Sequence, residues 1–535
     1  MLPAIVLALG WKQVTDVIHR SIDLHPLCVS IIDTPEFQRL RRVSQLGPCR
    51  WVFPGAVHDR FQHALGVAHL ARSWTEHFRA CQTELAITDA DVLCVTLAGL
   101  LHDLGHGPLS HFWETCFPPS AGGGGGGGGI PHHEELSCAM VDRLLARNRI
   151  DASPWLDDAD WRFVKALIRG SPSAALAAER PVDVRHGSKG VPGLDKRFLY
   201  DIVSNSRSGF DVDKLDYFER DCHYSGVVKV SFDRRRLMKQ ARVALARGPG
   251  PSDGQLQICW PVKCLYELQQ VFQTRFSLHT ELYQHRVAAA VGLMLRDAIA
   301  LTDASAHFRV LGASGAPLRL SECGTALDTS LDGYLQLSDE LLALVRAEAT
   351  RLAASETAEA EAAAAARADE SEPDTLHTAA ALLDRLDRRD LYRFAGSVVL
   401  EQSADAPRPA QLAGELERIC GAEALPAAVL RLDRKRVHYG CGDRNPVDEI
   451  RFFDNKEDAG NEDAQAVAAS VKHARPWPSS LYAARLPGAF EEVSLRLFVT
   501  DGRYLPAARA AFDAWCEERA LCNDACQVDE IAKAL

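Results

Sequence analysis

The chain has 535 residues, of which 47% are hydrophobic and 25% are charged. This is the composition of a globular protein, and the length exceeds one ordinary hydrophobic core, so two lobes are expected. The formal net charge of −12 argues against broad nucleic-acid binding through bulk electrostatics. Fifteen cysteines without CxxC spacing indicate reduced thiols in an intracellular compartment.

The N-terminal stretch 1–10 is apolar but lacks a basic region and is too short to cross a bilayer. We therefore expect neither a secretion signal nor a transmembrane segment, and a location in the nucleus or the cytoplasm.

The first candidate site element is DRFQH at 59–63. Apolar residues at helical spacing follow it towards Trp74 and predict a helix that begins there. This places His63 in the first turn of the helix, where its side chain can reach into a cleft.

The decapeptide HDLGHGPLSH at 102–111 is the most informative segment of the chain. It follows the apolar run 92–101, which is long enough to be a buried helix. His102 and Asp103 therefore lie at a helix end, where adjacent side chains can flank one ion. Imidazole and carboxylate together suit a divalent transition metal. The glycines and the proline that follow should break the helix and turn His111 back towards the same space.

The second candidate element is DVDKLDYFERD at 211–221. If it is helical, Lys214, Tyr217 and Asp221 share one face, and Asp213 lies beside that face. The alternative is a solvated acidic face over apolar core residues. That alternative does not explain why a cation, Lys214, and a phenol, Tyr217, are spaced so that both could contact a polyanion bound beside the carboxylate of Asp213.

Two segments are not expected to belong to the folded core. The octaglycine within 119–131 predicts a flexible surface loop, because ordering it costs too much entropy. The Ala- and Glu-rich segment 351–375 is typical of a low-complexity linker or insertion, although its first part could extend a helix.

The remaining pattern predicts a mainly α protein. We expect an all-helical lobe over 1–300, a helical extension over 301–350 and a smaller α+β lobe over 376–535. Within the smaller lobe the sequence predicts an amphipathic helix over 382–396 and short strands over 429–440 and 449–455.

The order His63, His102–Asp103, Asp213 resembles the H…HD…D signature of HD-domain metal-dependent phosphohydrolases. Five ordered blocks resemble, more narrowly, the eukaryotic dNTP triphosphohydrolases that carry a sterile-alpha-motif domain before the HD domain. The resemblance is dense over 11–300 and returns at 435–517, and its catalytic region begins at about Trp11, so the sterile-alpha-motif domain is not expected here. The blocks lie at 31–42, 52–67, 98–111, 208–226 and 274–287.

This resemblance implies an HD catalytic domain over 1–300 that hydrolyses dGTP and other dNTPs to deoxynucleoside and inorganic triphosphate, and so controls dNTP pools. It implies one iron or zinc ion on His63, His102, Asp103 and Asp213, with Mg²⁺ on the substrate phosphates.

The resemblance also implies the proton-transfer residues. His111 is the general acid and Glu114 orients it, while His106 and His133 line the same pocket. The family has aspartate where Glu114 stands, and the extra methylene can loosen the pair. His132 offers an alternative register for His133, but the following Glu134 favours His133.

Substrate contacts follow from the same blocks. The implied phosphate ligands are Arg60, Lys214, Arg275 and Tyr217, and the ligands of the sugar 3′-hydroxyl are Gln45, Leu46 and Asp221. On a regular helix Arg275, His279 and Tyr283 share one face at i, i+4 and i+8. Tyr283 matches the residue that packs on the sugar and excludes a 2′-hydroxyl, and a plain core helix is the alternative.

The family is activated by nucleotides bound between subunits, which implies a GTP or dGTP activator and a homo-oligomer, dimer or tetramer, with the 376–535 lobe in an oligomerisation or regulatory role. Two departures from the family, Pro261 and Glu267, weaken this expectation, since a glutamate repels bound triphosphate. The matching positions are Lys12, Asp33, Gln38, Arg41, Arg236, Lys263, His285 and Arg286.

Two other functions fit parts of the pattern. Another HD hydrolase, such as a phosphodiesterase or 5′-nucleotidase, would not need the three cations Arg60, Lys214 and Arg275. A non-catalytic nucleic-acid-binding HD protein would not need an intact ligand set, and the acidic balance argues against it.

Overall fold

The computed structural model describes residues 10–118, 129–170, 196–248, 254–313, 315–327, 329–363, 375–400, 407–453 and 473–521. Most of the expected glycine loop and the second half of the expected linker lie outside these residues. The first half of that linker continues helix α16, Leu341–Ala363.

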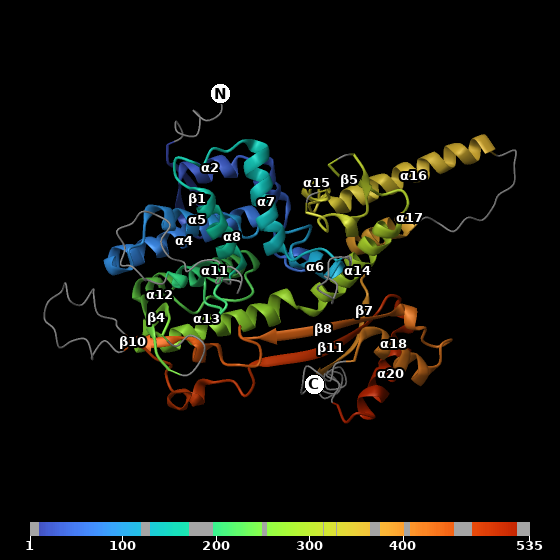
Figure 1. The fold of residues 1–535 in the computed structure, drawn as a ribbon. Coiled ribbons are helices and arrows are strands. Elements are labelled where there is room, and N and C mark those ends of the chain that lie inside the picture. Colours follow the sequence, from blue (N-terminus) through green and yellow to red (C-terminus); the bar gives the residue numbers. More distant parts are fainter. Residues whose placement is uncertain are drawn as a thin grey trace.

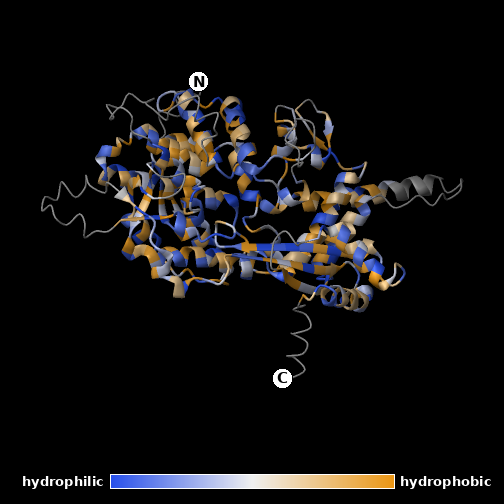
Figure 2. Ribbon diagram, turned by 60° about the horizontal axis from the view of Figure 1, so that its bottom comes forward, coloured by the Kyte–Doolittle hydropathy of each residue, from blue (hydrophilic) through white to orange (hydrophobic). Residues whose placement is uncertain are grey.

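The larger part of the molecule is a helical body in which two long helices pack at the centre, α4 (Arg60–Cys81) and α5 (Asp89–Leu101) (Figure 1). Asp59 caps α4 and Thr88 caps α5 in a capping box, which fixes where both helices begin. Hydrophobic residues concentrate inside this body (Figure 2). Its other helices are α2 (Pro26–Ile32), α3 (Pro35–Gln38), α6 (His111–Cys116), α7 (His133–Asn148), α8 (Asp158–Arg169), α10 (Tyr200–Val203), α11 (Val212–Ser225), α12 (Arg234–Gln240), α13 (Leu265–Leu278), α14 (Arg286–Ala304) and α15 (Leu331–Leu335).

The mainly α class is confirmed, but the first 300 residues also contain strands. A hairpin of β1 (Lys12–Asp16) and β2 (Arg20–Leu24) packs on α4. A four-stranded sheet runs in the order β10-β3-β4-β9. It combines β3 (Arg242–Ala246) and β4 (Leu256–Pro261) with β9 (Arg451–Phe453) and β10 (His473–Ala474). The C-terminal part of the chain therefore returns to the larger body. A short hairpin joins β5 (Val310–Leu311) to β6 (Pro317–Leu318).

The smaller lobe has a hydrophobic core of its own between an antiparallel sheet and two helices (Figure 1). The expected strands over 429–440 and 449–455 are present as β8 and β9, whereas the expected helix over 382–396 is only half correct. That helix ends at Asp387, Arg389 adopts a φ of 62°, and the chain then enters β7. The sheet order is β7-β11-β8. The elements are β7 (Arg393–Leu400), α18 (Pro409–Cys420), β8 (Leu430–His438), β11 (Glu491–Val499) and α20 (Leu505–Glu517). Helix α17 (Thr375–Asp387) packs on α14 and belongs to the core of the larger body.

Within the described residues, no helix combines the length and the apolar character needed to cross a membrane.

Candidate metal and catalytic site

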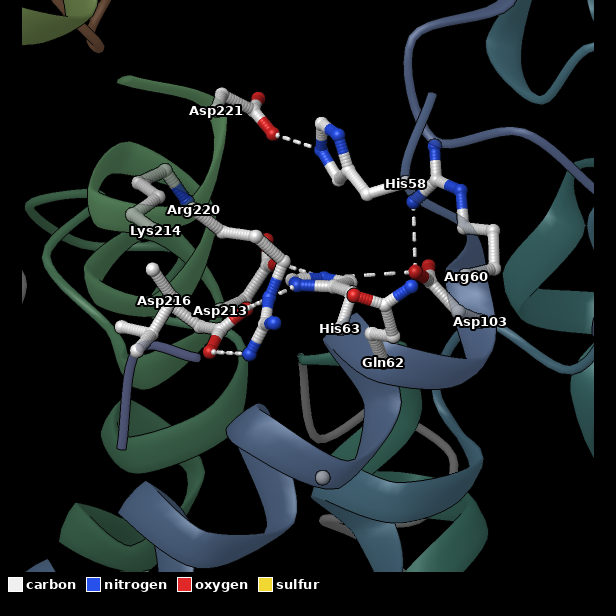
Figure 3. Close-up of polar contacts among 12 residues, drawn as sticks. His58, Arg60, Gln62, His63, Asp103, Asp213, Lys214, Asp216, Arg220 and Asp221 are labelled. Carbon is white, nitrogen blue, oxygen red and sulfur yellow. Dashed lines mark hydrogen bonds and ion pairs between the residues drawn. The ribbon is translucent and has the colours of Figure 1, made fainter. Parts of the chain in front are cut away.

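The structure places His63 in the first turn of α4 with its side chain fully buried, between Asp103 on one side and helix α11 on the other (Figure 3). Its Nδ1 lies 2.7 Å from a carboxylate oxygen of Asp216. Because an ionised carboxylate only accepts, Nδ1 carries a proton, and Nε2 is the atom at which a metal ion can replace a proton. That Nε2 lies 3.0 Å from Asp213 Oδ1 and 3.5 Å from Asp103 Oδ2.

His102 follows the last residue of α5 and points its Nε2 at the same carboxylates. Its Nδ1 donates to the carbonyl of Gly99 at 2.8 Å. The buried Nε2 makes no hydrogen bond to any described residue, and it lies 3.4 Å from Asp103 Oδ1 and 3.5 Å from Asp213 Oδ1. The structure thus brings together the four residues named as metal ligands from the sequence.

These four residues fit a transition metal. Two imidazole nitrogens and two carboxylates converge, and each imidazole is fixed by a hydrogen bond from its other nitrogen, as metal-ligating histidines usually are. Burial alone would lower the pKa of His63, but hydrogen bonds to Asp213 and Asp216 outweigh it and raise the pKa to about 10. The carboxylates around His63 therefore favour a positive charge at this position, which suits a bound metal cation.

A second cluster adjoins the first and contains the other predicted catalytic residues, His106, His111, Glu114 and His133. Glu114 Oε1 accepts from His133 Nδ1 at 2.7 Å, while His111 Nδ1 lies 3.6 Å from the other oxygen. Glu114 is therefore closer to His133 than to His111, its expected partner. His106 stacks on His133 at 4.0 Å and lies 3.2 Å from Asp103, so it connects the two clusters.

The charge state of the second cluster follows from these contacts. Burial raises the pKa of Glu114, but hydrogen bonds from His111 and His133 outweigh burial and hold it well below its usual range. Burial lowers the pKa of His111 below its usual value, and the contact with ionised Glu114 offsets only part of that effect. His132 lies outside the cluster and only precedes α7, which supports the choice of His133.

The turn that delivers His111 is strained. Leu109 and Ser110 adopt φ angles of 60° and 61°, a region in which non-glycine residues cost about 1–3 kcal/mol each. Tertiary contacts hold the turn in place. Asp339 accepts from the amide of Leu109 at 2.7 Å, and the Ser110 hydroxyl donates to the carbonyl of Ser44 and accepts from Arg60.

The three predicted phosphate cations are all paired in the structure. Arg60 is buried and donates to Asp103 at 2.6 Å, so it neutralises the carboxylate of a predicted metal ligand. Lys214 pairs with Asp211 at 2.8 Å, at the N-terminus of α11. Arg275 donates to the carbonyl of His438 in β8, so the smaller lobe reaches this side of the site. Burial and then the charge of Arg275 lower the pKa of His438 to about 4.

The predicted sugar contacts centre on Asp221. Its carboxylate accepts from Tyr283 Oη at 2.6 Å and lies 2.7 Å from His58 Nε2. His279 packs edge-on against Tyr283 at 4.9 Å. The regular helical face expected for Arg275, His279 and Tyr283 is wrong, because α13 ends at Leu278 and residues His279–Tyr283 form a π-helical turn.

Gln45 and Leu46 are buried and directly precede the 3-10 helix Gly47–Trp51. Gln45 Oε1 has no hydrogen-bond partner among the described residues, so it can still accept from a ligand.

The predicted activator residues fall into separate groups. Lys12, Asp33, Gln38 and Arg41 line one cavity of about 320 Å³ beside the β1–β2 hairpin. The others lie elsewhere: Arg236 forms an ion pair with Glu267, Lys263 is exposed in the turn after Pro261, His285 packs on Phe53, and the guanidinium of Arg286 lies over Phe394.

Sequence reasoning missed three buried residues of the site. Asp216 holds His63, and a signal for it existed, since it follows Asp213 by three residues on the same helix. His58 holds Asp221, and Arg39 donates to the carbonyls of Leu104 and His106. Neither His58 nor Arg39 carries a local sequence signal.

The chain is similar in sequence to known HD-domain proteins. The HD domain family model matches residues 60–191. The chain is 34% identical over 521 residues to the deoxynucleoside triphosphate triphosphohydrolase SAMHD1 of Gallus gallus, covering 95% of this chain and 75% of that protein. The Homo sapiens protein of the same name is also 34% identical, with 95% and 74% covered. The SAMHD1 homolog of Dictyostelium discoideum is 29% identical, with 83% and 71% covered.

Proposed function

Because the chain belongs to the SAMHD1 family of deoxynucleoside triphosphate triphosphohydrolases, we propose that it hydrolyses dGTP and other dNTPs to deoxynucleoside and inorganic triphosphate and so controls dNTP pools. The observation that carries the proposal is the convergence of His63, His102, Asp103 and Asp213, with both histidine Nε2 atoms facing the carboxylates.

The four ligands would hold one iron or zinc ion, and Mg²⁺ would accompany the substrate phosphates. A metal ion bound there supplies a water of lowered pKa and neutralises phosphate charge. Water oxygen attacks the α-phosphorus, the bond to the 5′-oxygen breaks, and triphosphate leaves the deoxynucleoside.

The other residues of the chain supply protons and positioning. His111 gives a proton to the 5′-oxygen, Glu114 orients its imidazole and favours its protonated form, and His106 and His133 pack beside it. Arg60, Lys214, Arg275 and Tyr217 contact the phosphates. For this, Lys214 exchanges Asp211, and Arg275 exchanges the carbonyl of His438, for substrate oxygens. Gln45, Leu46 and Asp221 hold the sugar.

Incubating the purified protein with each dNTP, with and without GTP, and separating the products tests this proposal. The expected products are a deoxynucleoside and intact triphosphate. Stepwise formation of diphosphate and monophosphate nucleotides would contradict it and favour another type of HD hydrolase.

Tyr283 sets the sugar preference in this proposal. We expect Tyr283→Ala to admit ribonucleotides and to reduce discrimination by up to roughly 100-fold, since an apolar pocket alone rejects an added hydroxyl only weakly. The measurement is the ratio of kcat/KM for dGTP and GTP at the catalytic site. Tyr283→Phe is the matched control, because it removes only the hydroxyl that donates to Asp221 and should retain discrimination. An unchanged ratio in Tyr283→Ala would show that the selection lies elsewhere.

The cavity lined by Lys12, Asp33, Gln38 and Arg41 supports a guanine-nucleotide activator site. Asp33 suits the guanine edge and Arg41 a phosphate, so GTP or dGTP is the expected activator. The second group, Arg236, Lys263, His285 and Arg286, would contact nucleotide in a homo-oligomer, a dimer or tetramer. There Arg236 would have to leave Glu267, which now neutralises it. The 376–535 lobe would serve this oligomer, and the expected location is the nucleus or the cytoplasm.

A further inference from the structure

A chain of buried ion pairs joins the cavity beside the hairpin to the metal ligand His63. Asp16, the last residue of β1, lines that cavity. Its carboxylate accepts from Arg220 Nη1 at 2.9 Å. Arg220 also donates to Asp216, at 2.8 Å from Nε and 2.9 Å from Nη2, and Asp216 binds His63 Nδ1 at 2.7 Å. The four side chains come from three elements that are far apart in the sequence.

This series of ion pairs is shielded from solvent along its length. The side chains of Arg220, Asp216 and His63 are 0% exposed, and Asp16 is 7% exposed. Helix α4 packs directly on the Asp216–Arg220 ion pair at Gly66, where an added methyl group would collide with Asp216 Oδ1 and Arg220 Nη2. Hydrogen bonds and ion pairs that are shielded from water are electrostatically stronger than those on the surface. The loss of one of these side chains therefore affects the contacts of the others.

Charge explains why Asp16 affects a metal ligand that it does not touch. Arg220 divides one positive charge between two carboxylates, so Asp216 keeps enough negative charge to accept strongly from His63. If Asp16 is neutralised, Arg220 acts on Asp216 alone, and Asp216 becomes a weaker acceptor. A histidine whose outer nitrogen is bound less strongly is a less basic metal ligand. Asp16 also accepts from the backbone amide of His19, whose Nε2 lies 2.6 Å from Asp216.

We propose that Asp16, in the wall of the cavity, is a positioning residue for the metal site, acting through Arg220 and Asp216 on His63. This inference rests on the proposed metal centre. It also gives a physical route by which an occupant of the cavity that contacts Asp16 changes the affinity of the metal site.

The test is Asp16→Asn, which keeps the size of the side chain and removes its charge. Asp23→Asn is the matched control, because Asp23 lies on the partner strand β2, is exposed, and among the described side chains accepts only from Gln13. Both variants and the wild type are loaded with Co²⁺. The Co²⁺ absorption spectrum is recorded, and the ion is withdrawn with a competing chelator. Asp216→Asn serves as the positive reference.

Outer contacts of metal ligands are typically worth 10–100-fold in metal affinity. We expect Asp216→Asn to lower the affinity for Co²⁺ by a factor within that range. Asp16→Asn should lower the affinity about 10-fold and alter the Co²⁺ spectrum. Asp23→Asn should change neither the affinity nor the spectrum. If Asp16→Asn does not fold, Arg220→Lys replaces it, since lysine keeps the charge but cannot bridge both carboxylates.

Two results would overturn the inference and are distinguishable from each other. If Asp216→Asn loses affinity while Asp16→Asn matches wild type in affinity and spectrum, the coupling stops at Asp216. If the wild type binds no Co²⁺, the proposed metal centre itself fails, and the inference fails with it.

Discussion

Replacing His102 with alanine should remove the tightly bound metal and reduce dNTP hydrolysis to background. His102 Nε2 is buried without a hydrogen bond, so metal binding is the role left for that lone pair among the described contacts. Losing a direct ligand should cost more than the 10–100-fold in metal affinity that outer contacts are worth. Metal content by elemental analysis and dNTP turnover are measured on the same preparation.

His102→Ala is a cleaner test than Asp103→Ala, because removing Asp103 leaves the buried charge of Arg60 unpaired and destabilises the fold. His223→Ala is the matched control, since His223 is exposed near the end of α11. Full metal occupancy and turnover in His102→Ala would refute the ligand assignment.

The second large effect is expected at His111. His111→Ala should lower kcat by about 10²–10⁴-fold, the contribution of a positioned general acid. Metal should be retained, because His111 belongs to the second cluster and not to the four-ligand set. Steady-state kinetics and metal analysis separate the two effects.

His132→Ala is the control for His111→Ala, since it removes an exposed imidazole next to the cluster. A His111→Ala protein with wild-type kcat would transfer the general-acid role to His133, the histidine that Glu114 holds more closely.

The resemblance implied the four proposed metal ligands, and their positions were predictable because short segments place them. A capped helix start fixes His63, and a helix end followed by glycines fixes His102 and Asp103. Asp213 lies in the first turn of α11, whose N-cap Asp211 is also visible in the sequence. Local rules of capping and periodicity act over a few residues, and these residues depend on little else.

Contacts between distant segments were not predictable. The pairing of β9 and β10 with β4 and β3 joins segments about two hundred residues apart and leaves no local pattern. For the same reason the sequence did not show that Arg60 neutralises Asp103. The π-helical turn that ends at Tyr283 breaks the spacing from which a helical face was predicted.

Hydrolysis of dGTP in ¹⁸O-labelled water tests the central claim most directly. The roles of the site residues require water oxygen to attack the α-phosphorus and the 5′-oxygen to leave with the deoxynucleoside. Mass spectrometry should therefore find one ¹⁸O atom in inorganic triphosphate and none in deoxyguanosine. Label in orthophosphate or diphosphate, together with a deoxynucleoside diphosphate or monophosphate, would contradict the account.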